Sequence, residues 1–286
     1  MKKILILLII TLDIFLFTNS KIIVNEFNKT INICLYTLMP SMFFQILFSN
    51  ILIKSSIEKY MPNRICRIFN INKNELAIIL LSMFSGYPNN IKLLKESKNE
   101  YLNYVTNYIN PSFLLTTVGF IYLKNIKISL IIFMSIITSN LFLTFLLRNK
   151  YVNDKYNKKD YKNIYSSSLI DTIKTLSIIF SNLLFISILV VLLKILLPFN
   201  NNINSFILGL LEFSKGIYEI SNLNIKIFNK GLLILIISVF ASISIHFQMI
   251  SINPKIKYIK YLKYRIFNIF ISVIVYIILF ILIYKI

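Results

Sequence analysis

Several predominantly apolar runs of about 20 residues constrain this chain more than any other feature of its sequence. The runs occupy residues 128–147, 176–197, 231–250 and 266–284, and each has the length that a helix needs to cross a hydrocarbon layer about 30 Å thick. They are too long for buried strands, and the alternating pattern of a membrane β-barrel is missing from the sequence. Because backbone N–H and C=O groups find no water inside a bilayer, helices are the remaining way to span it. The sequence therefore predicts an all-α polytopic membrane protein.

The composition agrees with this class. Of 286 residues, 57% are hydrophobic and only 5 are glycine, and the mean hydropathy is +0.73, far from the soluble average. The net charge of +20 would suggest a nucleic-acid partner in a soluble protein. Here it accompanies an abundance of Ile, Asn, Lys, Tyr and Phe that is typical of an AT-rich genome. We therefore expect the lipid bilayer, and no nucleic acid, as a partner.

Seven spans and two interrupted segments can be placed along the chain. Residues 76–91 and 203–220 are too short or too broken to span, so we interpret both as re-entrant hairpins or unwound half-helices. The first span could imitate a signal peptide, but no A-x-A-like cleavage site follows it, so we expect an uncleaved helix. The seven predicted spans are residues 4–24, 31–53, 108–123, 128–147, 176–197, 231–250 and 266–284.

The placement of Lys and Arg orients these segments. When the N-terminus is inside and both hairpins return to their own side, most of the 31 basic residues fall in cytoplasmic stretches, as the positive-inside rule requires. These stretches include residues 148–162 and 253–265, the second ending at Arg265. If residues 76–91 crossed the membrane instead, the basic cluster at 148–162 would move outside. We therefore predict a multi-pass cell-membrane protein with a cytoplasmic loop at residues 148–168.

This orientation produces an internal symmetry within one transmembrane domain, residues 1–286. A first helix, residues 1–30, precedes two repeats at residues 31–147 and 169–286, each composed of a span, a hairpin and two further spans. The two repeats have opposite orientations. Inverted repeats with broken helices at matching places are the design of secondary transporters, which build a binding site near the middle of the membrane.

The sequence contains no constellation typical of an enzyme. There is a single histidine, and there is neither a G-x-S-x-G motif nor a glycine-rich phosphate loop. Cys34 and Cys66 have the spacing neither of a metal site nor of a disulfide framework. We expect no catalytic residue, no cofactor and no metal.

The first candidate binding residues interrupt predicted helices at membrane depth, where a polar group costs free energy unless it meets a partner or a water-filled cavity. An unwound stretch there exposes N–H groups, and a helix that starts after it directs its positive end toward an anion. An ordinary interfacial turn, or at Asn110-Pro111 a structural kink, is the alternative. The residues are Ser85, Gly86, Tyr87, Pro88 and Asn89, followed by Asn110 and Pro111.

Three further candidates are polar side chains in apolar surroundings. Glu212, between Gly209 and Gly216, suits a coupling proton or sodium ion, or it is interfacial and merely solvated. His246 and Gln248 lie late in a predicted span, where a histidine can titrate near neutral pH and bind a ligand. A lone histidine also often only joins two helices through a hydrogen bond.

These motifs occur in an order that resembles the YlbJ-type sporulation integral membrane proteins, a branch of the nucleoside-recognition or Gate-domain membrane families. The resemblance covers roughly residues 38–251. It departs from the family pattern at Asn89, Asn90 and Ser242, where glycine or another small residue is expected. The motifs are Ser85-Gly86-Tyr87-Pro88 with Lys92, Asn110-Pro111-Ser112-Phe113 with Val118-Gly119, Glu212 with Gly216, and Ser244-Ile245-His246-Phe247-Gln248.

The resemblance implies a sporulation membrane transporter that moves dipicolinate, a small aromatic dianion, from the mother cell toward the forespore. It also implies a location in the mother-cell or outer forespore membrane. Helix N-termini and exposed amides at the candidate residues are compatible with two carboxylates. Two alternatives stay open: a nucleoside or nucleobase carrier, which would take a neutral ligand, and a membrane scaffold in spore assembly that transports nothing.

Overall fold

The computed structural model describes residues 2–94, 97, 99–150, 163–196 and 201–284, and within them every regular element is helical. Five helices are long and apolar enough to cross a membrane, which confirms the all-α polytopic class. Most of the predicted cytoplasmic loop, residues 151–162, lies outside the described residues. The five helices are Ser20–Lys54, Ile126–Leu146, Ile164–Leu192, Ile227–Ile252 and Tyr258–Tyr284.

The N-terminal part contains one long helix and a shorter one. Helices α2 (Ser20–Ile33) and α3 (Met39–Lys54) are joined by a single π-helical turn, η1 (Cys34–Leu38), so the predicted span 31–53 belongs to a longer helix. Helix α1 (Lys2–Thr18) ends before the predicted first span does. Its last turn is closed by side chains, because the Asn19 amide donates to the Phe15 carbonyl over 3.1 Å. Such bonds compete with the helical ladder and explain the break inside residues 4–24.

The first half of the bundle continues with a hairpin and a broken helix. The 3-10 turn η2 (Ile57–Tyr60) and helix α4 (Asn63–Phe69) lead into α5 (Lys73–Ser85), which begins at a capping box formed by Asn72 and Glu75. Its partner in the hairpin is α6 (Asn89–Leu94). Next come α7 (Leu102–Val105), the π-helix η3 (Phe113–Tyr122), α8 (Ile126–Leu146) and the 3-10 turn η4 (Arg148–Lys150).

The predicted span 108–123 is not one continuous helix. Residues 106–110 are unwound, and regular structure resumes only at Pro111. Proline disfavours a helical conformation at the residue before it and has no N–H to donate, so Asn110 cannot continue a helix into the next turn. The sequence located this break through the Asn110-Pro111 pair but not the unwound residues that precede it.

The second half repeats the order of the first. Helix α9 (Ile164–Leu196) is followed by a hairpin of α10 (Asn201–Leu211) and α11 (Phe213–Asn222), then by α12 (Ile227–Phe240), α13 (Ile243–Ile252) and α14 (Tyr258–Tyr284). The predicted span 231–250 is interrupted where Ala241 adopts a left-handed conformation at φ 64°. Each half therefore contains a helix, a hairpin, a broken helix and a final helix, and the opposite orientation of the two halves stays a prediction.

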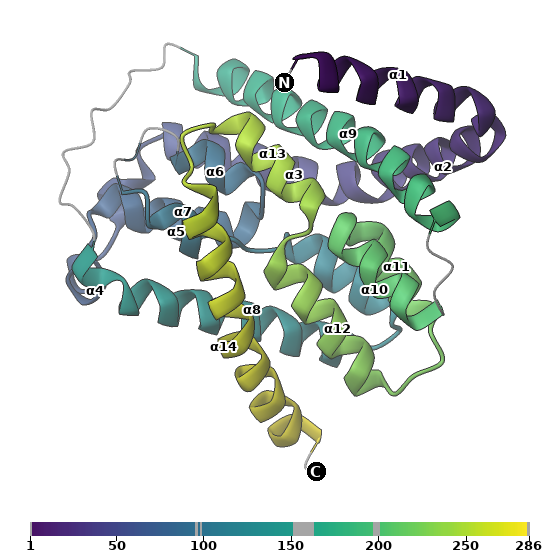
Figure 1. Cartoon of the computed structure of the whole chain (residues 1–286). Helices are drawn as coiled ribbons and strands as arrows, with labels where there is room; N and C mark the ends of the chain where they lie inside the picture. Colours follow the sequence, from purple (N-terminus) through teal and green to yellow (C-terminus); the bar gives the residue numbers. More distant parts are fainter. Residues whose placement is uncertain (1, 95–96, 98, 151–162, 197–200, 285–286) are drawn as a thin grey trace.

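The two hairpins approach the centre of the bundle from opposite ends. In Figure 1 α5 and α6 lie at the left of the molecule and α10 and α11 lie at the right, with α8 and α9 running between the two ends. Helix α8 packs against α12 and α14, and α9 packs against α2, α3 and α13. The breaks of the two halves consequently face each other inside the bundle.

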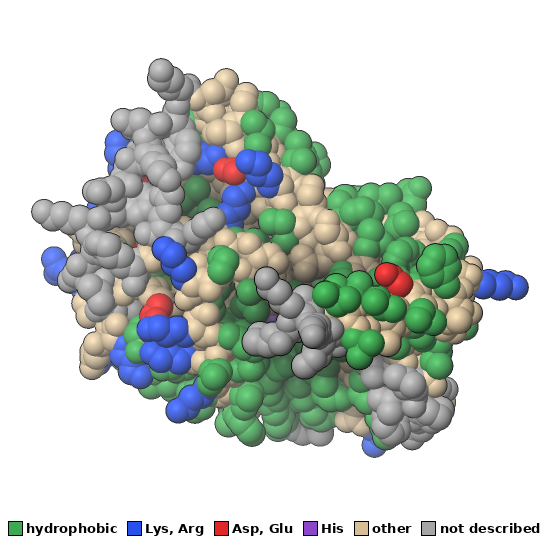
Figure 2. Space-filling view, turned by 45° about the horizontal axis from the view of Figure 1, so that its top comes forward, with side chains coloured by type: hydrophobic (Ala, Val, Ile, Leu, Met, Phe, Trp, Pro, Cys, Tyr) green, Lys and Arg blue, Asp and Glu red, His purple; other side chains and the backbone are tan. Residues whose placement is uncertain are grey.

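Basic side chains gather toward one end of the face shown in Figure 2. Among the basic residues, Lys257 and Lys260 contact the carboxylate of Glu100 over 2.7 and 3.1 Å, which attaches the connection between α6 and α7 to the start of α14. The hydrogen bonds from Lys257 and then Lys260 hold the pKa of Glu100 below its usual value. This end is the predicted cytoplasmic side.

The α10–α11 hairpin closes through two glycines. A Cβ atom on Gly216 would lie 2.0 Å from the Gly209 Cα and 2.4 Å from the Gly209 nitrogen, whereas a Cβ on Gly209 would mainly meet the flexible Cδ1 of Ile237 at 2.2 Å. The backbone of the hairpin cannot yield without separating its two helices, but a side-chain methyl group can rotate away.

We predict that Gly216→Ala destabilises the purified protein much more than Gly209→Ala does. The expected cost is about 3 kcal/mol or more for Gly216→Ala, which overpacks backbone against backbone. Thermal unfolding in detergent measures both variants. Equal unfolding temperatures for the two alanine variants would contradict this packing of the hairpin.

Candidate functional site

Six buried polar residues around the helix breaks form what we name the central polar cluster. Each is at most 1% exposed, and each has a side-chain N or O atom without a hydrogen-bond partner in the described structure. Helix α6 packs against α13, and Tyr87, Tyr261 and Arg265 lie close enough to interact electrostatically. The members are Tyr87, Asn89, Ser244, Gln248, Tyr261 and Arg265.

The tip of the first hairpin is held open by backbone geometry. Gly86 has a φ of +68°, and a Cβ there would lie 2.6 Å from the backbone nitrogen of Asn110, so only glycine fits. The Tyr87 N–H donates to the Tyr108 carbonyl over 2.8 Å. The unwound segment between α5 and α6, which includes Pro88, therefore lies directly against the unwound segment before Pro111.

Two of the predicted site residues at this tip have structural partners. The Asn110 amide donates to the Gln45 side-chain oxygen over 2.8 Å and to the Ser85 carbonyl over 3.2 Å, and its own oxygen accepts from the Phe113 N–H. The Ser85 hydroxyl donates to the Leu81 carbonyl over 3.0 Å. Asn110 and Ser85 thus hold the tip together, while the Tyr87 hydroxyl and both polar atoms of Asn89 have no partner in the described structure.

Glu212 forms the tip of the second hairpin. It is fully buried, and its carboxylate caps α11 by accepting from the Ser214 N–H, the Ser214 hydroxyl and the Lys215 N–H over 3.1, 2.6 and 2.7 Å. A carboxylate at a helix N-terminus is stabilised by the helix dipole. Both carboxylate oxygens are engaged in this cap, and the predicted role in ion coupling stays a prediction.

The second broken helix is attached to the second hairpin. The Ser242 hydroxyl, at the break between α12 and α13, donates to the Gly209 carbonyl over 2.8 Å. His246 bridges the same break, because its Nε2 lies 2.9 Å from the Phe240 carbonyl and its Nδ1 lies 2.9 Å from the Tyr258 hydroxyl. A carbonyl oxygen only accepts, so Nε2 carries a proton, while the Tyr258 hydroxyl can donate to Nδ1 or accept from it. Each ring nitrogen therefore has a partner within the protein.

Gln248 is placed differently from His246. Its amide is completely buried, and neither its nitrogen nor its oxygen has a partner in the described structure. Ser244 lies one helical turn earlier on the same face of α13, and its hydroxyl is likewise without a described partner. On this helix, Gln248 and Ser244 are therefore the side chains with polar atoms available to a ligand. His246 instead has a structural bond at each ring nitrogen.

Arg265 is the residue that sequence reasoning misplaced. The cytoplasmic stretch 253–265 was predicted to end there, but α14 begins at Tyr258 and the Arg265 side chain is 0% exposed. The signal that could have located it is a polar stripe at helical spacing, formed by Tyr261, Arg265, Asn268 and Ser272. These residues face the interior of the bundle, and the Asn268 amide donates to the Asn140 side chain over 2.8 Å.

Aromatic rings enclose the central polar cluster. Phe213, directly after Glu212, meets the Tyr87 ring at 5.7 Å and the Phe113 ring at 5.4 Å between centroids. On the other side the His246 ring lies 5.4 Å from that of Tyr261. These edge-to-face contacts connect the tips of both hairpins to the first broken helix and place apolar ring surfaces beside the central polar cluster.

Two ion-pair centres outside the central polar cluster tie helices together. Asp171 on α9 accepts from Lys54 over 2.6 Å and contacts Lys92 over 3.1 Å, which attaches α9 to α3 and α6. Sequence analysis did not single out Asp171. Because Lys54 is 8% exposed, this carboxylate supplies a buried ammonium group with a counter-charge.

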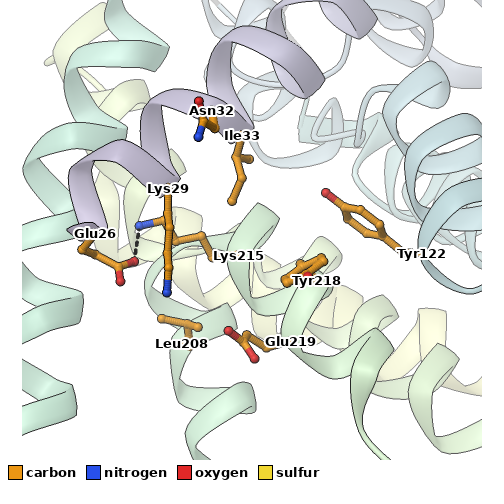
Figure 3. Close-up of a pocket in the computed structure, with 9 residues that line it drawn as sticks. All are labelled: Glu26, Lys29, Asn32, Ile33, Tyr122, Leu208, Lys215, Tyr218 and Glu219. Atoms are coloured by element: carbon orange, nitrogen blue, oxygen red, sulfur yellow. Dashed lines mark hydrogen bonds and ion pairs between the residues drawn. The ribbon is translucent and has the colours of Figure 1, made fainter. Parts of the chain in front are cut away.

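The second centre lies beside a side cavity of about 360 Å³ between α2 and the second hairpin. Figure 3 shows Glu26 of α2 and Lys215 of α11 joined across it, with 2.6 Å between the carboxylate and the ammonium group and side-chain exposures of 8% and 6%. This buried pair fastens α2 to the hairpin that Glu212 caps.

The arrangement offers hydrogen-bond donors and acceptors but no metal centre among the residues that the structure describes. In comparisons with known proteins, no family model matches the chain, and no curated protein or solved structure matches it. Fold and site together define a class: a polytopic α-helical membrane protein in which two broken hairpins and two broken helices enclose a buried polar cluster.

We predict that Glu26→Gln lowers the stability of the protein by about 3–5 kcal/mol, because it leaves the buried Lys215 ammonium group without its counter-charge. Replacing both partners, as Glu26→Leu with Lys215→Met, should recover much of that loss, since no buried charge then remains. Thermal unfolding in detergent measures the single and double variants. A single variant as stable as the unchanged protein would show that the pair does not hold α2 to the hairpin.

Proposed function

We propose that the chain is a secondary transporter of a small anionic metabolite in a cell membrane, rather than an enzyme. The observation that carries this proposal is the set of unpartnered polar atoms in the central polar cluster, enclosed by four helix breaks. A polar group inside a membrane protein costs free energy unless it is satisfied. Groups that have no partner among the described residues are suited to a polar ligand that supplies the missing bonds.

The geometry of the breaks supports transport over simple binding. Two hairpins that approach from opposite ends, each lying against a broken helix, are the arrangement in which a site near the middle of the membrane is opened to one side and then the other. Specific hydrogen bonds join each hairpin to its broken helix: the Tyr87 N–H donates to the Tyr108 carbonyl in the first half, and the Ser242 hydroxyl donates to the Gly209 carbonyl in the second.

The charge of the cluster supports an anion. Its only charged member is the cationic Arg265, and its amides and hydroxyls can all donate hydrogen bonds. Dipicolinate is the substrate that the resemblance implies, and its aromatic ring is chemically suited to the aromatic side chains of Tyr87 and Phe213, which pack together beside the cluster. Moving dipicolinate toward the forespore is the corresponding role in sporulation.

We predict that the purified protein in proteoliposomes takes up labelled dipicolinate, and that Gln248→Ala reduces the initial rate at least about tenfold by removing charge-assisted hydrogen bonds. Asn182→Ala is the control, since the Asn182 amide donates only to the Ile178 carbonyl of its own helix. Uptake of nucleosides but not of dipicolinate would favour a carrier of neutral ligands. If neither compound is taken up, the hypothesis of a membrane scaffold that transports nothing would be favoured.

The same variants in sporulating cells connect transport to physiology. Cells without the protein should make dipicolinate in the mother cell but fail to accumulate it in the spore core, and Gln248→Ala should resemble the deletion. Normal spore dipicolinate in the deletion strain would reject dipicolinate as the substrate.

A further inference from the structure

Arg265 is a buried cation without a counter-charge among the described residues. It lies at 0% exposure on α14, a helix long and apolar enough to cross a membrane. One guanidinium nitrogen, Nη2, donates to the Val239 carbonyl just before the α12–α13 break. Its Nε and Nη1 have no partner in the described structure. An arginine inside a membrane protein normally pairs with an acid or with several carbonyl groups, so two nitrogens without bonds require an explanation.

Four acids of the described chain have partners other than Arg265. Glu212 caps α11 with both oxygens, and Asp171 pairs with Lys54 and Lys92. Glu26 pairs with Lys215 and Glu100 with Lys257 and Lys260. No described carboxylate forms an ion pair with Arg265. A permanent counter-charge within the described part of the protein is therefore missing, which leaves the guanidinium suited to one that arrives with a ligand.

The groups around Arg265 show which ligand chemistry it can accept. The guanidinium lies within electrostatic reach of Tyr87, Tyr108 and Tyr261. The hydroxyls of Tyr87 and Tyr261 have no described partner and can donate to an oxygen of the same ligand. Their rings, together with those of Phe213 and His246, provide flat apolar surfaces beside these donors.

We propose that Arg265 is the specificity-determining residue of the central polar cluster and binds a carboxylate of an aromatic carboxylic acid. This inference rests on the proposed transport function and makes it more specific. Charge-assisted bonds from Nε or Nη1 to a carboxylate are stronger than bonds to a neutral amide. The site consequently discriminates between a carboxylate and its neutral isostere, which the amides of Asn89 and Gln248 alone would not achieve.

The test compares two probes of nearly the same shape on the full chain in lipid nanodiscs. The probes are dipicolinate and its neutral diamide, and calorimetry measures their affinities for the unchanged protein, Arg265→Met and Arg265→Lys. We expect the unchanged protein to prefer dipicolinate. Arg265→Met should bind dipicolinate about 10- to 100-fold more weakly while changing the diamide affinity less than about threefold. The dipicolinate affinity of Arg265→Lys should lie between those of the unchanged protein and Arg265→Met, because lysine keeps the charge but lacks the planar guanidinium group.

Several results would overturn this assignment. One is that the arginine variants lose affinity for both probes equally. The others are that Arg265→Met binds dipicolinate as tightly as the unchanged protein does, that the unchanged protein binds both probes equally, and that it binds neither. The first result would mean that Arg265 only holds α12 through the Val239 carbonyl. If thermal unfolding shows that Arg265→Met does not fold, the test rests on the other two proteins: a smaller preference for dipicolinate over the diamide in Arg265→Lys than in the unchanged protein supports the assignment, and an equal preference overturns it.

Failure of this inference can be separated from failure of the proposed function. If Arg265→Met transports dipicolinate in proteoliposomes at an undiminished rate, transport stands and the assignment of Arg265 falls. If the unchanged protein binds dipicolinate selectively through Arg265 but moves none across the membrane, the binding site stands and the transport function falls.

Discussion

The bilayer supplies no hydrogen bonds, and the rest of this structure depends on how the chain meets that constraint at its helix breaks. Each break releases backbone N–H and C=O groups that a continuous helix would satisfy. The Tyr87 N–H finds the Tyr108 carbonyl, and the Gly209 carbonyl finds the Ser242 hydroxyl. Because these bonds join a hairpin to a broken helix in each half, the breaks occur in pairs that stabilise each other.

The same constraint separates structural polar groups from those available to a ligand. Asn110, Glu212 and His246 are polar and buried, yet their side chains are occupied by bonds that cap helices or bridge a break. Gln248 and Asn89 are equally buried and have no such bonds in the described structure. Polarity at membrane depth therefore identifies the region of the site, and hydrogen-bond partners identify which side chains in that region can take a substrate.

The sequence was sufficient to predict the features that depend on interactions between residues close together in the chain. Apolar runs of membrane length predicted the all-α class, and glycine and proline predicted the breaks at Gly86 and before Pro111, because these residue types have special backbone preferences. The sequence was not sufficient to predict features that depend on packing between segments far apart in the chain. Ala241 breaks a helix without any typical breaker residue, and Arg265 follows four nearby lysines, so it resembled a loop charge until α14 was seen to begin at Tyr258.

The most direct test of this account is to locate a bound ligand. A crystal of the protein with a brominated aromatic dicarboxylate, measured at the bromine absorption edge, would show the ligand by anomalous scattering. The account predicts one peak enclosed by the four breaks, with a carboxylate oxygen about 3 Å from the Arg265 guanidinium and the Gln248 amide in contact. A peak confined to the side cavity beside Glu26 and Lys215, or no peak inside the bundle, would contradict it.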